Sequence, residues 1–464
     1  MLRATIHPDP PPAAHMNLLL AISRLTIVLI LLPSALDWRS PTLAGARSWA
    51  LLGLVVGPLA VAAVEVWVWR ASRERSRITA ALAATTLGVA FLVLAATLVA
   101  EGRFQWMRRE VLAADPARLE QLGRHIIVGY RDPAELEALV ERRAVSGVFV
   151  TVHNVQGRTT DSVRRSIDAL QEKRREQQLA PLWIATDQEG GAVSRLSPPL
   201  ARSDRLSDLV ARIPDKAERS AAVAQLGAEH GRALASVGVN VNFAPVVDLN
   251  RRVINPADRL TRIHERAISA DPRVVTEVAG RYCAALWQYG VHCTLKHFPG
   301  LGRVLADTHV ASADLATSTR ELEAADWIPF RALMPDSSAF TMLGHVRLAA
   351  VDGKRPVSFS PAVVAGLIRG AWRHDGILVT DDFCMGAVTG SREGIGAASV
   401  AALNAGVDLI LVSYDPDQYY AVMHALLQAD RAGRLRREVL ARSEERLKRV
   451  AGQGVAMLGA PMAP

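Results

Sequence analysis

The sequence predicts an α/β protein, a (β/α)8 TIM-like barrel preceded by a three-helix transmembrane region. Three observations predict this arrangement. The chain of 464 residues is dominated by Leu, Val and Ala up to about Ala100, whereas charged and apolar residues mix beyond it. From Gln121 onward, short runs rich in Val and Ile alternate with longer amphipathic stretches. Short polar motifs follow one predicted strand after another.

Three apolar stretches at the N-terminal side are predicted to be membrane spans, because about 20 apolar residues cross the hydrocarbon layer as a helix. They are residues 18–36, which contain Arg24, residues 49–69, which contain Glu65, and residues 78–100, which contain no charge. The first stretch has an alternative interpretation as the apolar region of a signal peptide, which is shorter than a span.

The short connection at residues 70–77 indicates the orientation of these spans. It contains four arginines and one glutamate, and basic short loops stay in the cytoplasm. Three spans then make a multi-pass protein of a bacterial inner membrane, with the large domain on the periplasmic side. Arg103, Arg108 and Arg109 follow the third stretch and favour the opposite orientation, so the orientation stays open.

The resulting division of the chain has five parts. A tail is followed by the membrane region, a linker, the barrel and a second tail, at residues 1–17, 18–100, 101–120, 121–455 and 456–464.

Eight strands are predicted in the barrel. They are continuous apolar runs, which are expected where both faces of a parallel sheet are covered, at residues 126–129, 147–152, 182–186, 239–244, 291–296, 339–344, 377–380 and 409–412. Helices are predicted between them at residues 134–143, 160–176, 220–237, 272–289, 361–374 and 419–432.

An open doubly wound sheet is the competing arrangement. It would gather functional residues from a few strand ends around its switch point. Residues from six strand ends converge only if the strands form a ring. The polar motifs that follow the strands are 187–191, 245–248, 297–300, His345, Asp381-Asp382 and 413–415.

The formal net charge of +8 does not indicate a nucleic-acid partner, because the arginines are spread along the chain and not clustered with aromatic residues. An anionic membrane surface or an acidic polymer suits this charge better. The three cysteines, Cys283, Cys293 and Cys384, lack the spacing of metal ligands. We expect buried thiols, with a Cys283–Cys293 disulfide as the alternative in an oxidising compartment. No metal and no cofactor is predicted.

The polar motifs contain carboxylates, basic residues and histidines, but no Gly-x-Ser-x-Gly elbow and no phosphate-binding glycine loop. This composition favours polyhydroxylated ligands, since glycosidic bonds are cut by a nucleophile and a proton donor. Asp187 follows a strand, and Gly190-Gly191 would let a ligand approach the backbone. A helix N-cap is the alternative role for Asp187.

At five motifs the chain resembles the glycoside hydrolase family 3 β-N-acetylglucosaminidases, which include bacterial muropeptide-recycling hexosaminidases. The resemblance runs from about Leu122 to about Ala451. Its motifs are Ala-Thr-Asp-Gln-Glu-Gly-Gly at 185–191, Asn-Phe-Ala-Pro-Val-Val-Asp at 242–248, Lys-His-Phe-Pro-Gly at 296–300, Asp-Thr-His at 307–309 and Thr-Asp-Asp at 380–382.

The resemblance implies a retaining exo-β-N-acetylglucosaminidase that removes terminal β-linked N-acetylglucosamine (GlcNAc) from peptidoglycan fragments or related glycans. Asp381 would attack the anomeric carbon, and His309 would transfer the proton with support from Asp307. The resemblance also assigns sugar-holding roles to Asp187, Arg195, Arg266, Lys296 and His297. Asp382 is expected to tune Asp381 or to be structural, because adjacent strand residues point to opposite faces.

Two departures from the family pattern concern the same region. Leu301 stands where the family usually has a histidine, so leaving-group preference could differ. The Arg-x-Phe pattern of the family becomes Arg266-Ala267-Ile268.

Two other functions remain open at this stage. One is a family 3 hydrolase of another β-glycoside. Relatives of that kind use a glutamate from a second domain as proton donor. The chain ends about 50 residues after its last predicted strand, and this length is too short for a second domain. The other is a non-catalytic glycan-binding membrane protein. The natural leaving group and the oligomeric state are not predicted.

Overall fold

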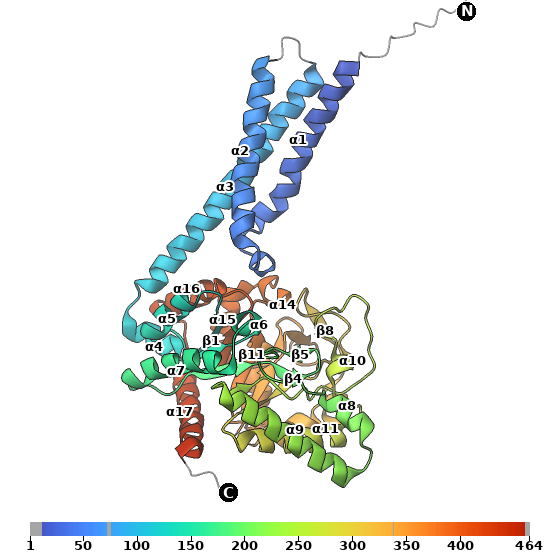
Figure 1. Cartoon of the computed structure of the whole chain (residues 1–464), viewed down its shortest axis with the longest axis vertical. Coiled ribbons are helices and arrows are strands. Elements are labelled where there is room, and N and C mark those ends of the chain that lie inside the picture. The colour runs from blue at the N-terminus through green and yellow to red at the C-terminus, as the bar shows by residue number, and fades with distance from the viewer. Residues whose placement is uncertain (1–11, 72–75, 337, 460–464) are drawn as a thin grey trace, which may run out of the picture. The chain divides into compact units, whose positions relative to one another are not determined.

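The computed structural model describes residues 12–71, 76–336 and 338–459. The chain divides into two compact units, Met1–Arg109 and Glu110–Pro464, which Figure 1 labels by element. Each unit is described by itself. Parts of the predicted tails, and residues 72–75 of the arginine-rich connection, lie outside the described residues.

The first unit consists of long apolar helices. α1 (Pro12–Leu36) is followed by the short 3-10 helix η1 (Pro41–Leu43), α2 (Arg47–Ala71) and α3 (Arg77–Leu112). Among the described residues, three segments are long and apolar enough to cross a membrane, and they cover the three predicted stretches: Met16–Leu36, Arg47–Ala71 and Arg77–Leu112.

The two charged residues that interrupt the predicted spans bind each other. Arg24 in α1 donates from Nε to Oε1 of Glu65 in α2 at 2.7 Å, and the Glu65 side chain is buried. Ionisable residues within apolar helices normally face the interior of a bundle and pair with one another. The pair therefore fixes α1 against α2 and removes two isolated charges from the apolar surface.

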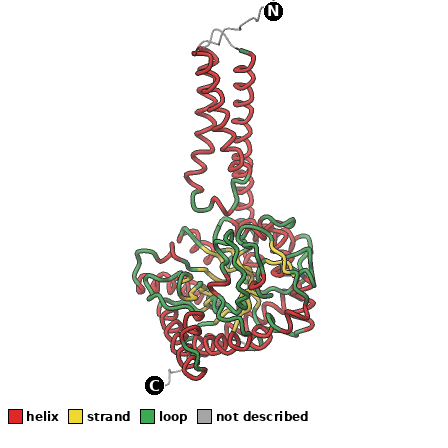
Figure 2. The backbone as a smooth tube through the Cα atoms, turned by 90° about the vertical axis from the view of Figure 1, so that its right-hand side faces the viewer, coloured by secondary structure: helices red, strands yellow, loops and turns green. Residues whose placement is uncertain are grey.

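The second unit is built on an eight-stranded parallel sheet, surrounded by helices in Figure 2. All eight predicted strands are confirmed. They are β1 (Ile126–Gly129), β2 (Gly147–Phe149), β3 (Trp183–Thr186), β6 (Val241–Asn242), β7 (Cys293–Phe298), β9 (Ala339–Leu343), β11 (Leu378–Asp382) and β12 (Leu409–Val412).

The sheet is nearly closed. Its strand order is β6-β3-β2-β1-β12-β11-β9-β7. The two end strands also approach each other, because Val241 forms a parallel bridge with His292. The Asn242 amide donates to the His292 carbonyl at 2.8 Å, and the Thr294 amide donates to the Ala244 carbonyl at 2.8 Å. The carboxyl ends of strands distant in sequence are thus brought to one side of the unit.

Short strand pairs and helices complete the second unit. The pairs are β4 (Gln188–Gly190) with β5 (Val193–Ser194) and β8 (Ala313–Leu315) with β10 (Val346–Leu348). The helices are α4 (Pro116–Gly123), α5 (Pro133–Glu141), α6 (Val152–Val155), α7 (Thr160–Glu176), α8 (Leu206–Arg212), α9 (Lys216–Ser236), α10 (Ile263–Arg266), α11 (Pro272–Trp287), η2 (Leu301–Arg303), α12 (Thr319–Ala324), α13 (Ile328–Leu333), η3 (Val357–Phe359), the π-helical η4 (Ala362–Ala371), α14 (Gly386–Thr389), α15 (Gly394–Ala405), α16 (Gln418–Arg431) and α17 (Arg437–Gly459).

Asp-Pro pairs start three of these helices. Asp115, Asp132 and Asp271 are N-cap residues whose carboxylates accept a hydrogen bond from a backbone N–H of the first turn. The following proline fits the first helical position, where an N–H would be unpaired in any case. These pairs set where α4, α5 and α11 begin.

The structure corrects the prediction of three free thiols. Cys283 in α11 and Cys293 in β7 form a disulfide, with a Cα–Cα distance of 5.3 Å. A short turn reverses the chain between α11 and β7, so residues ten positions apart meet where helix and strand pack together. Cys384 is a buried free thiol, as predicted.

A buried carboxylate ties four elements together at the amino ends of the strands. Asp408 accepts from Arg369 Nη2 at 2.6 Å and from Arg446 Nε at 2.9 Å. It also accepts from the Ser443 hydroxyl and the Leu378 amide. Burial opposes its ionisation, but the two guanidinium groups lower the pKa of Asp408 below its usual range.

Replacing this carboxylate should destabilise the second unit strongly. Asp408→Ala leaves two largely buried guanidinium groups without their partner, so we expect the free energy of unfolding to fall by about 3–5 kcal/mol. Urea unfolding of the full-length protein in detergent micelles measures it. The control is Asp375→Asn, which removes an exposed partner of the same Arg446 and should cost at most about 1 kcal/mol. Equal losses in the two variants would contradict the assigned role.

Candidate active site

Residues from distant parts of the chain meet at the carboxyl side of the sheet. Asp187 follows β3, Lys296 and His297 end β7, and Asp381 lies near the end of β11. Arg266 ends α10, and His309 lies in the loop after η2. The contacts below bring seven of the eight predicted site residues into connected groups around these strand ends, and Arg195 lines the adjoining pocket.

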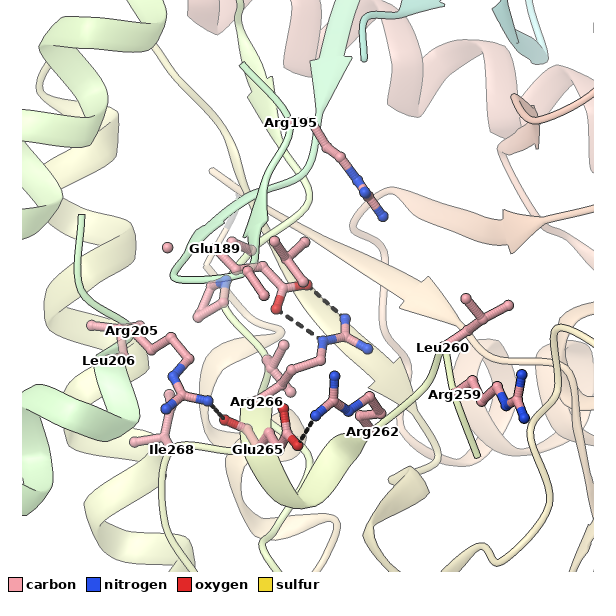
Figure 3. A pocket seen from close by; sticks show the side chains of 16 residues that line it. Glu189, Arg195, Arg205, Leu206, Arg259, Leu260, Arg262, Glu265, Arg266 and Ile268 are labelled. Atoms are coloured by element: carbon pink, nitrogen blue, oxygen red, sulfur yellow. Dashed lines mark hydrogen bonds and ion pairs between the residues drawn. The ribbon is translucent and has the colours of Figure 1, made fainter. Parts of the chain in front are cut away.

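A buried ion network forms one side of the site. Lys296 Nζ lies 2.7 Å from Asp187 Oδ1 and 2.7 Å from Glu189 Oε1. The guanidinium of Arg266 binds Glu189 with two hydrogen bonds, Nη2 to Oε1 at 2.6 Å and Nε to Oε2 at 3.0 Å. Figure 3 shows this Arg266–Glu189 pair at the centre of the pocket.

The charges within this network stabilise one another. Burial alone would raise the pKa of Glu189, but Arg266 and Lys296 lower it far below its usual value. Burial alone would lower the pKa of Lys296, but Asp187 and Glu189 raise it above the usual value. Glu189, Arg266 and Lys296 are therefore ionised at neutral pH, and the hydrogen-bonding directions within the network are fixed.

Glu189 was not predicted as a site residue, although it lies inside the recognised motif. Its carboxylate faces the basic residues because β4 pairs antiparallel with β5 and turns Gln188 and Gly190 to other contacts. Gln188 binds Ser197 and the Leu196 amide. The motif itself was the only sequence signal for Glu189.

The two glycines of the same motif have a structural role in addition to the predicted approach of a ligand. Gly190 and Gly191 have φ of +96° and +58°, which disfavours other residues. A Cβ at Gly190 would lie 2.2 Å from the Asp204 carbonyl, and one at Gly191 would meet the Arg205 side chain. The glycines thus make room for residues 203–205, whereas ligand approach alone was predicted.

His297 is held by a buried carboxylate. Asp248 Oδ2 lies 2.7 Å from His297 Nδ1 and accepts from the His297 amide at 3.1 Å. The other oxygen of Asp248 accepts from the Leu301 amide at 2.6 Å. Asp248 therefore orients the imidazole and anchors the start of η2.

Leu301 is buried, so the residue that departs from the family pattern is packed into the unit. The other departure is also apolar and buried, since Ala267 and Ile268 are both almost inaccessible. Neither substitution places a new polar group in the site.

The loop after η2 brings a second histidine together with its own carboxylate. His309 Nδ1 lies 2.8 Å from Asp307 Oδ1, which also accepts from the Thr261 hydroxyl at 2.8 Å. Asp307 Oδ2 accepts from the Leu260 amide at 3.1 Å. Burial raises the pKa of Asp307, but these hydrogen bonds and His309 outweigh it and lower the pKa. Nε2 of His309 is left for other partners.

Asp381 is surrounded by imidazoles. Burial raises the pKa of its carboxyl, but the electrostatic interactions with His297, His345 and His309 outweigh burial and lower it. Asp381 is therefore ionised at neutral pH although it is largely enclosed. Its carboxylate oxygen Oδ1 accepts a hydrogen bond from the adjacent Asp382 amide at 2.9 Å, which leaves the other oxygen without a hydrogen bond among the described residues.

His345 is the third imidazole near Asp381. The sequence analysis named it only as one of the polar motifs after the strands. Its Nδ1 lies 2.7 Å from the Ser358 hydroxyl and its Nε2 lies 3.0 Å from the Asp382 carbonyl. Burial lowers the pKa of His345, despite the opposing charges of Asp381 and Asp382. A neutral ring that donates to the Asp382 carbonyl fits these contacts.

Asp382 is engaged in local structure. Its carboxylate accepts from the Cys384 amide, the Ser413 amide and hydroxyl, and the Tyr414 amide, at distances of 2.6–3.0 Å. Three of these hydrogen bonds come from the loop after β12 and one from the turn after β11, and together they leave little capacity for a substrate. The structure thus separates the two adjacent acids, as the alternation of strand residues predicts.

Arg195 lines a pocket of about 200 Å³ with Glu189 and Arg266. Figure 3 shows its side chain reaching into the open space beside the Glu189–Arg266 pair. The guanidinium is exposed and has no hydrogen bond to the described residues. It is placed to bind a ligand that enters the pocket.

The site combines three features: an enclosed carboxylate beside imidazoles, a histidine paired with its own carboxylate, and a network of fixed charges. Together they suit hydrolysis of a polyhydroxylated substrate. No cluster of potential metal ligands occurs among the residues that the structure describes.

Comparison with known proteins identifies the family. Residues 117–450 match the glycosyl hydrolase family 3 N terminal domain, and the chain belongs to this family. It is a glycoside hydrolase. The chain is 32% identical over 343 residues to the Beta-hexosaminidase LpqI of Mycobacterium tuberculosis, covering 72% of this chain and 82% of that protein.

Solved structures agree with this assignment. A glycoside hydrolase family 3 β-N-acetylglucosaminidase from Paenibacillus sp. superposes with a TM-score of 0.66 at 29% identity, over 74% of this chain and 64% of the other. A family 3 glycosyl hydrolase from Mycobacterium smegmatis gives a TM-score of 0.63 at 30% identity, over 73% of this chain and 98% of the other.

The ion network predicts how stability depends on pH. The lowered pKa of Glu189 stabilises the folded state above the unfolded value of about 4.3, and this contribution is lost as pH falls below it. The raised pKa of Lys296 stabilises below about 10.4 and is lost at higher pH. Between these limits, Glu189→Gln should reduce the free energy of unfolding by about 3 kcal/mol.

Urea unfolding of both proteins between pH 3 and pH 9 tests this prediction. The difference between wild type and Glu189→Gln should be constant from about pH 5 to pH 9 and should shrink below about pH 4. A difference that grows on acidification would contradict the assignment.

Proposed function

We propose that this hydrolase is a retaining exo-β-N-acetylglucosaminidase that releases terminal β-linked GlcNAc through a covalent glycosyl-enzyme. The observation that carries the proposal is the ionised, largely enclosed Asp381 beside three histidines, one of which forms a pair with Asp307. The approach of the two sheet ends supports a closed (β/α)8 barrel as the scaffold.

In the first step, an oxygen of Asp381 forms a bond to the anomeric carbon while the bond to the leaving-group oxygen breaks. His309 in its protonated form donates a proton from Nε2 to that oxygen, so the alcohol leaves neutral. Asp307 at Nδ1 orients the ring and stabilises its positive charge. Imidazole is the side chain that most readily both gives and takes a proton in general acid–base catalysis.

In the second step, water attacks the anomeric carbon. The neutral His309 accepts a proton from the water, and the bond to Asp381 breaks to regenerate the carboxylate. Two displacements at the same carbon give net retention of the β configuration. The proton balance closes, because His309 is protonated again at the end of the cycle.

We assign the sugar-binding role to Asp187, Arg195, Arg266, Lys296 and His297. The bonds of Lys296 to Asp187 and Glu189 hold the Asp187 carboxylate and the Lys296 ammonium group in fixed directions, so hydroxyl groups of a bound sugar meet preoriented partners. Relatives named Beta-hexosaminidase and β-N-acetylglucosaminidase support GlcNAc as the sugar. Peptidoglycan fragments and related glycans are the proposed substrates.

We also propose that residues 18–100 anchor the enzyme in the bacterial inner membrane, that residues 101–120 are a linker and that residues 121–455 are the catalytic domain, on the periplasmic side. Three long apolar helices support the anchor. The Cys283–Cys293 disulfide supports the periplasmic side, since disulfides persist in oxidising compartments.

The catalytic assignments predict distinct losses of activity. Asp381→Ala should abolish release of nitrophenol from the β-GlcNAc aryl glycoside. His309→Ala should lower kcat/KM by about 10²–10⁴-fold, with a smaller effect on aryl than on alkyl leaving groups, which depend more on protonation.

Asp314→Asn is the matched control, because Asp314 is an exposed acid of β8 that pairs with Arg347. It should retain wild-type kinetics. Full activity of Asp381→Ala would refute the nucleophile, and sugar binding without turnover by the wild type would instead favour a non-catalytic binding protein.

The proposed orientation predicts that protease added to intact spheroplasts degrades the catalytic domain without lysis. On denaturation without reductant, a maleimide should label Cys384 but not Cys283 or Cys293. Degradation only after lysis, together with labelling of all three cysteines, would place the domain in the cytoplasm.

A further inference from the structure

Four large aliphatic side chains are exposed on the two loops that carry and support Asp307. They are Ile254, Leu260, Leu305 and Val310, with exposed fractions of 67%, 59%, 64% and 70%. We call these four residues the aliphatic rim. Elsewhere in the described part of the catalytic unit, Val152 and Tyr414 are the remaining exposed large hydrophobic residues. Clustered apolar exposure of this kind marks an interaction site.

Hydrogen bonds tie the two loops of the rim together. Asn255 Nδ2 donates to the Leu305 carbonyl at 2.7 Å. The Leu260 amide donates to the Asp307 carboxylate, and the Val310 amide donates to the Asp307 carbonyl at 3.1 Å. The aliphatic rim is therefore held around Asp307, on the loops that present His309.

Positive charge accompanies the aliphatic rim. Arg252 and Arg259 are exposed on the same loop as Ile254 and Leu260 and have no side-chain partner among the described residues. Figure 3 shows the Arg259 guanidinium pointing away from the Glu189–Arg266 pair. Arg259 also lines the same pocket as Arg195 and Arg266, so it is positioned for an acidic group beside the bound sugar.

We propose that the leaving group is an anionic amphiphile, with an acidic group bound by Arg259 and a hydrocarbon part placed on the aliphatic rim. The inference rests on the proposed function. His309 protonates the departing oxygen, so the group bearing that oxygen lies beside the Asp307–His309 pair, where the rim is located. Each methylene removed from water contributes to binding.

An anionic amphiphile would cover the aliphatic rim and supply Arg259 with a counter-charge, whereas a neutral sugar would do neither. A short hydrophilic glycan would leave all four aliphatic side chains in water and Arg259 without a counter-charge. Such amphiphiles concentrate at membranes, and the chain carries three helices long enough to span one.

Four synthetic β-GlcNAc glycosides test charge and hydrocarbon separately. The leaving groups are 3-hydroxydecanoate, 3-hydroxybutyrate and the methyl ester of each acid. The full-length enzyme in lipid nanodiscs should hydrolyse the decanoate glycoside with a kcat/KM at least about 10-fold above that of the butyrate glycoside. The acids should also exceed their esters by about 3- to 5-fold.

Variants of the loops separate specific binding from partition of the probe into lipid. Leu305→Ser combined with Val310→Ser should reduce the decanoate-to-butyrate ratio of kcat/KM to the value expected from partition of the probes into lipid alone. Arg259→Gln should remove the preference for acids over esters. Val152→Ser and Arg434→Gln are the matched controls, since both residues are exposed elsewhere. Both controls should keep the wild-type ratios.

The outcomes distinguish this inference from the proposed function. No hydrolysis of the nitrophenyl β-GlcNAc glycoside would refute the proposed function itself. Hydrolysis of that glycoside with equal kcat/KM for the four probes would overturn the leaving-group inference alone. Equal losses on all probes in the rim variant would show that the rim closes over the sugar, which also overturns the inference.

Discussion

The arrangement of the site depends on one buried ammonium group, Lys296 Nζ, held between the carboxylates of Asp187 and Glu189. Two acids that close together would repel each other without a cation between them, and a buried unpaired charge is strongly unfavourable. Arg266 binds the other side of Glu189. The end of β7, the turn after β3 and the end of α10 are therefore held in one relative position, which gives the pocket its shape before any substrate arrives.

The same electrostatic logic gives the other acids of the site separate tasks. The Asp248 carboxylate binds His297 and the Leu301 amide, and the Asp382 carboxylate accepts hydrogen bonds from the loop after β12. Asp307 is directed to His309. Asp381 alone keeps an uncommitted oxygen while nearby histidines favour its ionised form. Environment, and not residue type, thus separates the proposed nucleophile from its neighbours.

The sequence predicted the fold well because its signals are local. Continuous apolar runs marked all eight strands, and polar motifs marked the carboxyl ends of six of them. Partners that lie far apart in sequence could not be predicted: Glu189 with Lys296 and Arg266, Asp248 with His297, and Thr261 with Asp307. Alternation of strand residues separated Asp381 from Asp382. Lys296 and His297 were both assigned to the site from the family resemblance, and they lie where the register of β7 with β9 shifts. The disulfide was only the alternative to buried thiols in the sequence analysis, because the approach of the two cysteines depends on packing of α11 against β7.

The central claim is that Asp381 becomes covalently bonded to the sugar. A 5-fluoro derivative of β-GlcNAc with a good leaving group slows breakdown of the glycosyl-enzyme, so the intermediate accumulates and can be located by peptide mass spectrometry. The account predicts one sugar adduct on the peptide that contains Asp381. Turnover of the reagent with no adduct, or an adduct on another residue, would contradict it.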